Sequence, residues 1–233
     1  MGSTQGRHVI TTAVTPDNNF FPLPRGVVTP IITCHLRQLA AFYPHRQLLD
    51  YILDGFTNGF DIGFQGSFND PNTRPRNLRS AALYEEQVDL AVHREISRGH
   101  TSGPFSSQPF QRTHCSPIGA APKLDGSVRL ILDLSSPRGS AVNEGISQEE
   151  FRCTYSKFDD AVQLVTYLGV GAYLAKLDIK HAFRLCPVRP DQRPLLCYRW
   201  RGLFYVDTRL PFGGRSSPAI FNSFADLLAW IFV

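Results

Sequence analysis

Two short apolar runs, residues 118–121 and 128–132, are joined across the dipeptide Asp125-Gly126, and this pattern constrains the fold of the chain most strongly. An Asp-Gly pair between apolar runs is typical of a β-hairpin, because both positions of its tight turn require a positive φ. We therefore predict a hairpin here, with Asp125 and Gly126 both in the left-handed region. Antiparallel β-structure is thus one fixed component of the fold.

A second pair of apolar runs predicts another hairpin. Residues 196–200 and 203–208 flank the dipeptide Arg201-Gly202, which places a glycine in the turn. Residues 173–177 are a short apolar run that predicts a buried strand, and residues 60–64 predict a short strand between loops. The strands are therefore expected to come from segments that lie far apart in the sequence.

Helices are predicted where apolar residues recur at intervals of three and four. In chain order they are expected as pieces within residues 35–53 broken at Pro44, over residues 80–96 before a stop at Gly99, from Ser156 to the glycines at 169 and 171, and from Ser217 onward. Asp159, three residues after Ser156, predicts a capping box at the start of the third helix. Residues 1–33 and 101–116 are expected to be a lead-in and a loop. This mixture implies an α+β fold in which helices cover one face of a sheet.

The charge of the chain is unevenly distributed along the sequence. The formal net charge is +4, yet residues 170–215 alone contain nine basic and three acidic side chains, so the remainder is net negative. A basic segment of this kind suits a polyanionic partner such as nucleic acid. A solvated charged face with extended arginines explains the same segment equally well.

Neither apolar runs nor cysteines indicate a membrane protein or a secreted one. No stretch reaches the roughly 18 consecutive apolar residues of a transmembrane helix, and residues 1–15 lack the pattern of a secretory signal. The five cysteines are scattered without CxxC pairs, which favours reduced thiols over a disulfide framework or a zinc site. We expect an intracellular protein without a membrane partner.

Asp178 follows the predicted strand 173–177 within the octapeptide Lys-Leu-Asp-Ile-Lys-His-Ala-Phe, residues 176–183. A carboxylate at the end of a buried strand needs compensation, because burying an unpaired charge is unfavourable. A bound Mg²⁺ would provide this compensation and would suit phosphoryl transfer. Taken alone, Asp178 is explained at least as well as a cap of the helical turn that follows.

Two further segments give Asp178 a context. Residues 122–129, Pro-Lys-Leu-Asp-Gly-Ser-Val-Arg, put two cations on or beside the first predicted hairpin, and residues 210–222 contain a loop, Leu-Pro-Phe-Gly-Gly, that opens the last helix. With residues 176–183 between them, these segments resemble, in chain order, the fingers hairpin, motif A and motif B of retroelement reverse transcriptases. From about residue 50 onward the chain resembles the tyrosine-recombinase, or DIRS-like, group of retrotransposons.

This resemblance implies a right-hand polymerase fold that consists of fingers and a partial palm. The implied regions are an N-terminal lead-in at residues 1–50, a fingers-like region at residues 51–155 and a partial palm at residues 156–233. The palm sheet would use the strand at residues 173–177, with the helices that begin at Ser156 and Pro218 behind it.

The resemblance also assigns roles to individual residues. The residues assigned to the incoming deoxynucleotide are Lys123, Arg129, Ala182, Phe183, Pro211, Phe212 and Gly213. Asp178 would be the catalytic, metal-binding aspartate, and the carbonyl of Ile179 would be a further Mg²⁺ ligand. Lys123 and Arg129 would reach the triphosphate, with ordinary surface charge as the alternative. Phe183 would be the steric gate against a ribose 2′-hydroxyl, with core packing as the alternative.

The implied activity is RNA-directed DNA synthesis, in which a primer 3′-hydroxyl attacks a deoxynucleoside triphosphate with two Mg²⁺ ions. The implied partners are an RNA template, a DNA primer and deoxynucleotides, and RNase H and recombinase domains would belong to the parent polyprotein. An aromatic residue at Phe183 disfavours a viral RNA-dependent RNA polymerase.

The Tyr-x-Asp-Asp hairpin that the family carries after motif B does not occur before Val233. We therefore expect this chain alone to be inactive as a polymerase, to expose a sheet edge and to aggregate. The alternative hypothesis is a degenerate or domesticated transposon remnant that acts at most as a nucleic-acid-binding module.

Overall fold

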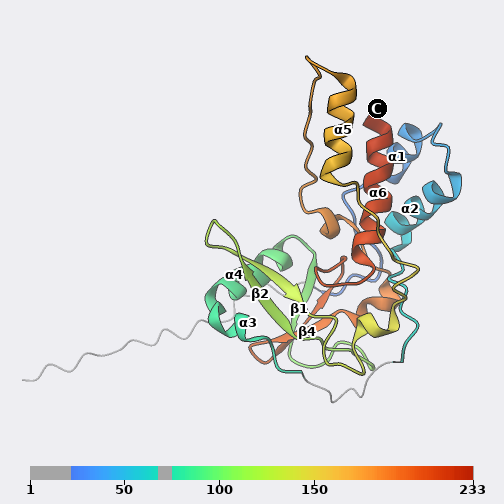
Figure 1. Cartoon of the computed structure of the whole chain (residues 1–233). Helices are drawn as coiled ribbons and strands as arrows, with labels where there is room; N and C mark the ends of the chain where they lie inside the picture. The colour runs from blue at the N-terminus through green and yellow to red at the C-terminus, as the bar shows by residue number, and fades with distance from the viewer. Residues whose placement is uncertain (1–21, 68–74, 233) are drawn as a thin grey trace, which may run out of the picture.

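The computed structural model describes residues 22–67 and 75–232, and these build a mixed α+β fold (Figure 1). A three-stranded antiparallel sheet has the order β1-β5-β4, formed by β1 (Thr101–Phe105), β4 (Cys197–Trp200) and β5 (Leu203–Asp207). A separate two-stranded sheet pairs β2 (Ile118–Pro122) with β3 (Val128–Leu132). Both hairpins predicted from the sequence are confirmed.

The two hairpins turn in different ways, and only one follows the prediction in detail. In the β4–β5 hairpin, Arg201 and Gly202 have φ angles of 46° and 82°, so both turn positions are left-handed. In the β2–β3 hairpin, Gly126 has a φ of 77° but Asp125 is not left-handed, so that part of the prediction is wrong. Its turn is longer, with the Gly126 N–H donating to the Lys123 carbonyl at 3.1 Å. The longer loop removes the need for a positive φ at Asp125.

Strand β1 lies within residues 101–116, where the sequence predicts only a loop. The prediction is wrong because Gly103 and Pro104 disfavour the interior of a strand. In the structure β1 is an edge strand, where a proline without an N–H is tolerated, and its pairing with β5 shifts register between Ser102 and Phe105. Gly103 permits this irregularity because its φ of 130° suits glycine.

Six α-helices and three short 3₁₀ turns complete the described residues. They are α1 (Thr33–Leu39), α2 (Arg46–Asn58), α3 (Arg79–Leu83), α4 (Glu85–Ser97), α5 (Phe158–Leu168), α6 (Ser217–Phe232), η1 (Val142–Gly145), η2 (Ala182–Leu185) and η3 (Pro190–Leu195). The break at Pro44 is confirmed, whereas the helix predicted over residues 80–96 is interrupted at Tyr84, whose φ is −123°. Within the part described, no helix has the length and apolar character that crossing a bilayer requires.

Helices cover the strands on the α3–α4 side, because α4 contacts β1 and β3 while α3 contacts β2. Helix α6 instead packs on α2. The Phe56 ring of α2 is 1% exposed and lies 5.1 Å from Phe60 and 4.7 Å from Phe224 of α6. Residues 60–64 make only two isolated β-bridges, to separate segments, so the strand predicted there does not form a ladder.

The prediction of a buried strand at residues 173–177 is wrong. The segment pairs with no strand among the described residues, and the side chains of Tyr173, Leu174 and Leu177 are 100%, 77% and 75% exposed. A strand exists only through hydrogen bonds to a neighbouring strand, which an apolar sequence cannot supply by itself. The predicted arrangement of the palm sheet is therefore not present in these residues.

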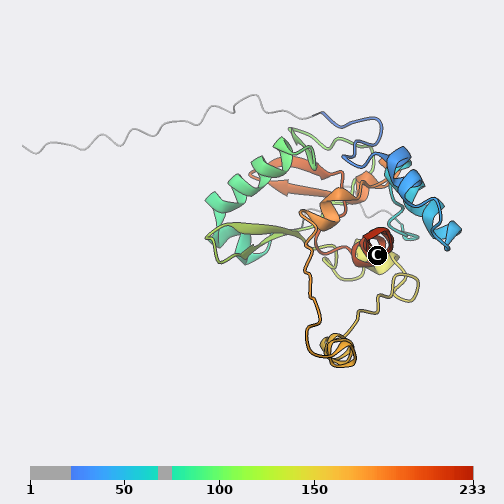
Figure 2. The same ribbon diagram turned by 90° about the horizontal axis from the view of Figure 1, so that it is seen from above.

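Helix α5 stands apart from the other helices when the molecule is seen from above (Figure 2). It has no buried residue, and Phe158 and Tyr167 are 83% and 87% exposed, so its predicted place behind a sheet is wrong. The predicted capping box is displaced by one residue. The Lys157 N–H donates to the Asp160 carboxylate at 2.7 Å, and the helix begins at Phe158 rather than at Ser156.

The regional boundaries at residues 50 and 155 stay a prediction. Helix α2 runs across residue 50, and a single core cluster contains Leu36, Val142 and Phe224, one from each implied region. The described residues of these three regions therefore share one core. Most of the implied lead-in, residues 1–21, lies outside the described residues.

The exposed apolar side chains of α5 and the following segment predict self-association. Replacing Tyr167 and Tyr173 by lysine should raise the concentration at which the chain aggregates by about threefold or more. The melting temperature should be unchanged, because both side chains are fully or largely exposed. Light scattering and calorimetry measure the two quantities. Leu124→Lys, on the hairpin tip, is the control and should change neither; equal aggregation of all three proteins would contradict the prediction.

Candidate functional site

A cavity of about 430 Å³ lies where α4, the β2–β3 hairpin, the turn before η2 and the loop after β5 meet. Seven of the nine site residues predicted from the sequence line it: Lys123, Arg129, Asp178, Ile179, Ala182, Pro211 and Phe212. They come from three segments that are distant in sequence. The structure therefore brings most of the predicted site residues to one place.

Phe183 and Gly213, the remaining two predicted residues, are not among the residues that line the cavity. The Phe183 ring is half-buried and lies 5.3 Å from the Phe212 ring and 5.6 Å from the Phe221 ring of α6. Phe183 therefore packs in an aromatic cluster, and Phe212 separates this cluster from the cavity. The packing role that the sequence left open for Phe183 is observed.

The loop after β5 is fastened to the hairpin at two points. The Arg129 guanidinium lies 4.9 Å from the centre of the Phe212 ring, a cation–π contact. The Leu132 N–H donates to the Phe212 carbonyl at 3.2 Å, which extends β3 toward the loop. Arg129 therefore faces the cavity while its stem and charge also hold the loop.

Gly213 allows the loop to approach β3 this closely. Its φ is 114°, and a Cβ at this position would lie inside the van der Waals radius of the Leu132 carbonyl oxygen. The Gly213 carbonyl accepts a hydrogen bond from the Asn143 side chain at 2.9 Å, and the Asn143 carboxamide oxygen accepts the Arg215 N–H at 2.8 Å. Asn143 gives no signal in the sequence, because its role depends on a contact with a loop about seventy residues away.

Asp178 is exposed rather than buried, and the premise of a desolvated carboxylate at the end of a strand is wrong. The reason is that residues 173–177 are exposed and have no partner strand among the described residues. Asp178 opens a tight turn in which the Ala182 N–H donates to the Ile179 carbonyl at 3.2 Å. His181 has a φ of 66° in this turn, an unusual conformation for a residue other than glycine.

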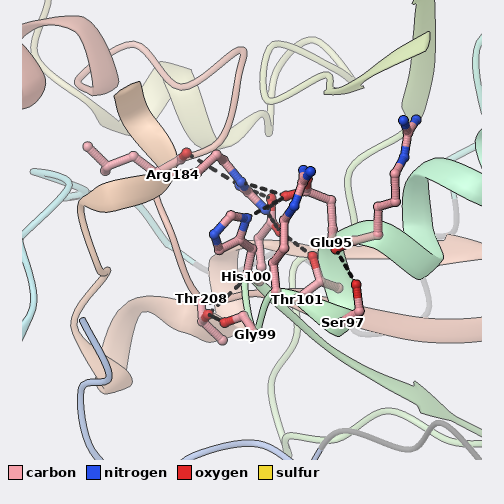
Figure 3. A network of polar contacts seen from close by, with 11 residues as sticks. Glu95, Ser97, Gly99, His100, Thr101, Arg184 and Thr208 are labelled. Carbon is pink, nitrogen blue, oxygen red and sulfur yellow. Dashed lines mark hydrogen bonds and ion pairs between the residues drawn. The ribbon is translucent and has the colours of Figure 1, made fainter. Parts of the chain in front are cut away.

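A buried network of charged side chains forms one wall of the cavity (Figure 3). The Arg184 guanidinium donates to both carboxylate oxygens of Asp207, at 2.9 and 2.7 Å, and its Nε donates to Glu95 at 2.9 Å. Glu95 also accepts a hydrogen bond from His100 Nδ1 at 3.0 Å, and Asp207 accepts one from the Thr101 hydroxyl at 2.7 Å. Every charge in this network is compensated by an opposite charge or a donor.

The network fixes the ionisation of Glu95. Burial opposes a charge on this carboxyl, but the hydrogen bond from His100 and the charge of Arg184 outweigh it and lower the pKa of Glu95 to about 2. Burial likewise lowers the pKa of the Arg184 guanidinium, and Asp207 and Glu95 more than reverse that effect, so its pKa is raised. Glu95 and Arg184 are therefore charged throughout the neutral range.

The free charge on the cavity is predominantly positive. Of its three carboxylates, Asp207 pairs with Arg184, and Glu95 pairs with Arg184 and, at 3.6 Å, with Arg98, whereas Asp178 has no ion-pair partner among the described residues. The cationic side chains on the walls, besides Arg184, are Arg94, Arg98, Lys123 and Arg129. Arg94 and Arg98 of α4 were not among the predicted residues, because nothing in a charged helical face indicates which cavity it borders. The walls suit an anionic ligand.

The basic segment 170–215 is not a continuous basic surface. Arg184, Arg193 and Arg209 are only 6%, 1% and 4% exposed. Arg193, for example, donates to two backbone carbonyls at 2.6 and 2.8 Å. These arginines stabilise the fold, so their number overstates the charge that this segment offers to a polyanion.

The residues of the cavity do not by themselves make a metal site. In residues 22–67 and 75–232, no group of three or more His, Cys, Asp or Glu side chains could hold a metal ion. Asp178 offers one carboxylate, and the Ile179 carbonyl is already engaged by the Ala182 N–H. This donor set fits Mg²⁺ only as part of a site in which a ligand supplies phosphate oxygens.

Comparisons with known proteins bear on this site. No family model matches the sequence. Similar curated proteins include the Pro-Pol polyproteins of simian foamy virus type 1, which is 31% identical over 108 residues, and of simian foamy virus type 3 (strain LK3), 30% identical over 108 residues. The matches cover 46% of this chain and only 8% and 9% of the polyproteins. The chain thus spans less than a tenth of these relatives.

Solved structures that align with this chain include foamy viral proteins. A protease-reverse transcriptase in complex with double-stranded DNA aligns with a TM-score of 0.47 and 18% identity, over 91% of this chain and 38% of that one. A protease-reverse transcriptase in complex with an RNA/DNA hybrid aligns with a TM-score of 0.44 and 17% identity, over 91% and 29%. These likenesses are distant. The relationship in sequence, together with the three ordered motifs, supports a retroelement reverse transcriptase without distinguishing the DIRS-like group.

Stability should depend on the ionisation of Glu95. Its pKa is lowered from 4.5 to about 2, so its contribution is complete above pH 4.5 and is lost as the pH falls toward 2. Glu95→Gln should melt at a lower temperature than the parent at pH 6, and the difference should shrink between pH 4.5 and pH 2. Thermal melts across this range measure it. Glu149→Gln, an exposed carboxylate, should give no such convergence; a constant gap for Glu95→Gln would contradict the prediction.

Gly213→Ala should separate the loop after β5 from strand β3. The matched control is Gly139→Ala, because Gly139 also has a positive φ, 86°, but no atom within 4 Å of a Cβ. We expect a loss of about 1–2 kcal/mol in unfolding free energy for the control, from backbone strain alone. Gly213→Ala should lose at least about 3 kcal/mol, because the steric conflict with Leu132 is added. Urea denaturation measures both, and equal losses would contradict the proposed close approach.

Proposed function

We propose that this chain is the nucleotide-binding part of a retroelement reverse transcriptase of the DIRS-like group, formed by its fingers and part of its palm. The observation that carries the proposal is the convergence of Lys123, Arg129, Asp178 and Phe212 on one cavity. These residues belong to the three segments that resemble the fingers hairpin, motif A and motif B. The ligand of the cavity is an incoming deoxynucleoside triphosphate.

The cations of the cavity bind the triphosphate. Lys123 lies near the tip of a hairpin and Arg129 on its second strand, so the two charges approach the ligand from one side. Arg94 and Arg98 of α4 add charge on the neighbouring wall. A bound Mg²⁺ would neutralise part of the triphosphate charge, and Asp178 with the Ile179 carbonyl would be its ligands from this chain.

The sugar of the nucleotide lies against Ala182, with Phe183 and Phe212 beneath it. In this proposal Phe183 acts against a ribose 2′-hydroxyl indirectly. The centres of the Phe183 and Phe212 rings lie 5.3 Å apart, so the Phe183 ring sets the position of Phe212 and with it the depth of the cavity. Pro211 and Gly213 set the course of the loop that completes the wall. The gate therefore acts as part of a packed aromatic cluster.

The template and primer, an RNA strand and a DNA strand, bind across the open side of the cavity. Polymerisation with two metal ions would require the carboxylates of a Tyr-x-Asp-Asp hairpin, which these 233 residues do not contain. The proposal for this chain alone is therefore nucleotide binding without DNA synthesis. RNase H and recombinase domains, and an intracellular location, are part of the proposal for a protein that carries this chain.

The alternative of a degenerate remnant that at most binds nucleic acid is not favoured. A remnant of that kind has no need to keep two cations and an unpaired carboxylate on one cavity. A nucleic-acid-binding surface would also use exposed arginines, whereas three of the nine basic residues in the segment 170–215 are buried.

Nucleotide binding by the whole chain tests the proposal. A fluorescent dATP analogue with Mg²⁺ should bind the parent, and Lys123→Ala and Arg129→Ala should each raise the dissociation constant by about tenfold. Arg112→Ala removes an exposed cation that does not border the cavity and should have no effect. Competition of dATP and ATP against the fluorescent analogue measures how strongly the site selects against a ribose 2′-hydroxyl. In the parent, dATP should compete better than ATP, and Phe183→Val should reduce the difference between their inhibition constants.

Two outcomes would overturn parts of the proposal. Binding that is unaffected by both cation variants would place the nucleotide elsewhere. Primer extension on an RNA template is the test for Asp178: we expect none from this chain, and robust extension that survives Asp178→Ala would rule out Asp178 as a metal ligand.

A further inference from the structure

The side chain of Arg184 donates hydrogen bonds to three other residues. Neither its position in the sequence nor the resemblance to reverse transcriptases assigns it a role. It is 6% exposed and lies in η2, shortly after the turn that carries Asp178. Its guanidinium makes two hydrogen bonds to Asp207, one to Glu95 and a longer one, 3.4 Å, to the Leu210 carbonyl. Figure 3 shows the side chains of Arg184 and Glu95 meeting from separate segments of the chain.

The partners of Arg184 belong to the other elements that wall the cavity. Asp207 ends β5, and Leu210 directly precedes Pro211 and Phe212 in the loop that Gly213 closes. Glu95 lies on α4 between Arg94 and Arg98, the two unassigned cations of the cavity. One guanidinium therefore joins the turn of Asp178, the loop of Phe212 and the cationic face of α4.

We propose that Arg184 is a positioning residue that holds these three elements in register, so that Asp178, the Phe212 loop and the α4 cations face one ligand. This inference rests on the proposed nucleotide-binding function and deepens it. Arg184 does not contact the ligand in this arrangement, because its donors are directed at Asp207, Glu95 and the Leu210 carbonyl. Its effect on the ligand passes through the elements that it joins.

The planar shape of the guanidinium explains why an arginine suits this position. A guanidinium presents several donors in a fixed fork, and two parallel bonds to Asp207 set the angle between η2 and β5. A lysine ammonium could satisfy the charge of the carboxylates without imposing that angle. A buried ion network contributes little net stability compared with a well-packed neutral set, so its main effect here is on geometry.

The test separates positioning from stability with two triple variants of the full chain. The first, Glu95→Gln with Arg184→Met and Asp207→Asn, removes the charges of these three side chains while keeping hydrogen-bonding groups for His100 and Thr101. The second, Asp61→Asn with Arg189→Met and Asp191→Asn, is the matched control. It removes another arginine that is paired with two carboxylates, at 2.9 and 2.6 Å, but that does not border the cavity.

Amide hydrogen exchange, followed by mass spectrometry, is the first readout. In the first triple variant, exchange should rise at least tenfold in both residues 178–184 and residues 208–214, while α2 and α6 stay as protected as in the parent. The control variant should leave both segments unchanged. Parent-like protection of both segments in the first variant would overturn the proposal. This measurement needs no nucleotide, so it tests the positioning role even if the parent protein does not bind one. Failure of the parent to bind a nucleotide would contradict the proposed function but not the positioning role.

Nucleotide affinity is the second readout, because a purely structural role would not change it in a folded protein. The dissociation constant of the dATP analogue should rise at least tenfold in the first triple variant and stay within twofold in the control. Arg184→Lys covers the case in which the first variant does not fold. It keeps the charge but loses the fork, and exchange should rise in at least one of the two segments. Parent-like exchange and affinity in Arg184→Lys would also overturn the proposal.

Discussion

The cavity depends on a single electrostatic constraint, which is that a guanidinium buried to 6% exposure must be matched by carboxylates. Arg184 satisfies this requirement with Glu95 and Asp207, and in doing so it joins a helix, a strand and a 3₁₀ turn from distant parts of the sequence. Arg184 offsets one of the two negative charges of Glu95 and Asp207, and Arg98, 3.6 Å from Glu95, offsets the other. Without these pairings, an anionic ligand would meet three uncompensated carboxylates instead of one.

A second constraint is steric and acts on the loop after β5. The loop after β5 reaches strand β3 because Gly213 has no Cβ, and the Phe212 carbonyl then accepts the Leu132 N–H at 3.2 Å. This contact turns Phe212 toward Arg129 on one side and toward Phe183 on the other. Arg184, Gly213 and the aromatic residues therefore have linked roles. Ion pairing fixes the elements around Arg184, and close packing fixes the loop after β5. In the proposed function the ligand would lie in the cavity that these elements border.

Much of the local structure could be predicted from neighbouring residues. Glycine at 126 and at 202 marks both hairpin turns, and the spacing of apolar residues predicts most of the helices. The failures are the elements whose conformation depends on a distant partner. Strand β1 forms in spite of Gly103 and Pro104 because β5 is beside it. Residues 173–177 have a strand-like sequence but remain extended and exposed, because no described strand pairs with them.

The sequence by itself determined which chemical groups are available and in what order: two cations around a turn, an aspartate before a short aromatic segment, and a glycine-containing loop before the last helix. Only the tertiary structure decided which of the charges are free. Glu95 and Asp207 are paired with Arg184, and Glu95 is also paired with Arg98. Asp178 is left exposed, and Arg94 borders the cavity from a helix that carries no motif. The reason is that turns and helical periodicity arise from residues close in sequence, whereas ion pairing and burial arise from contacts between residues some twenty to ninety positions apart.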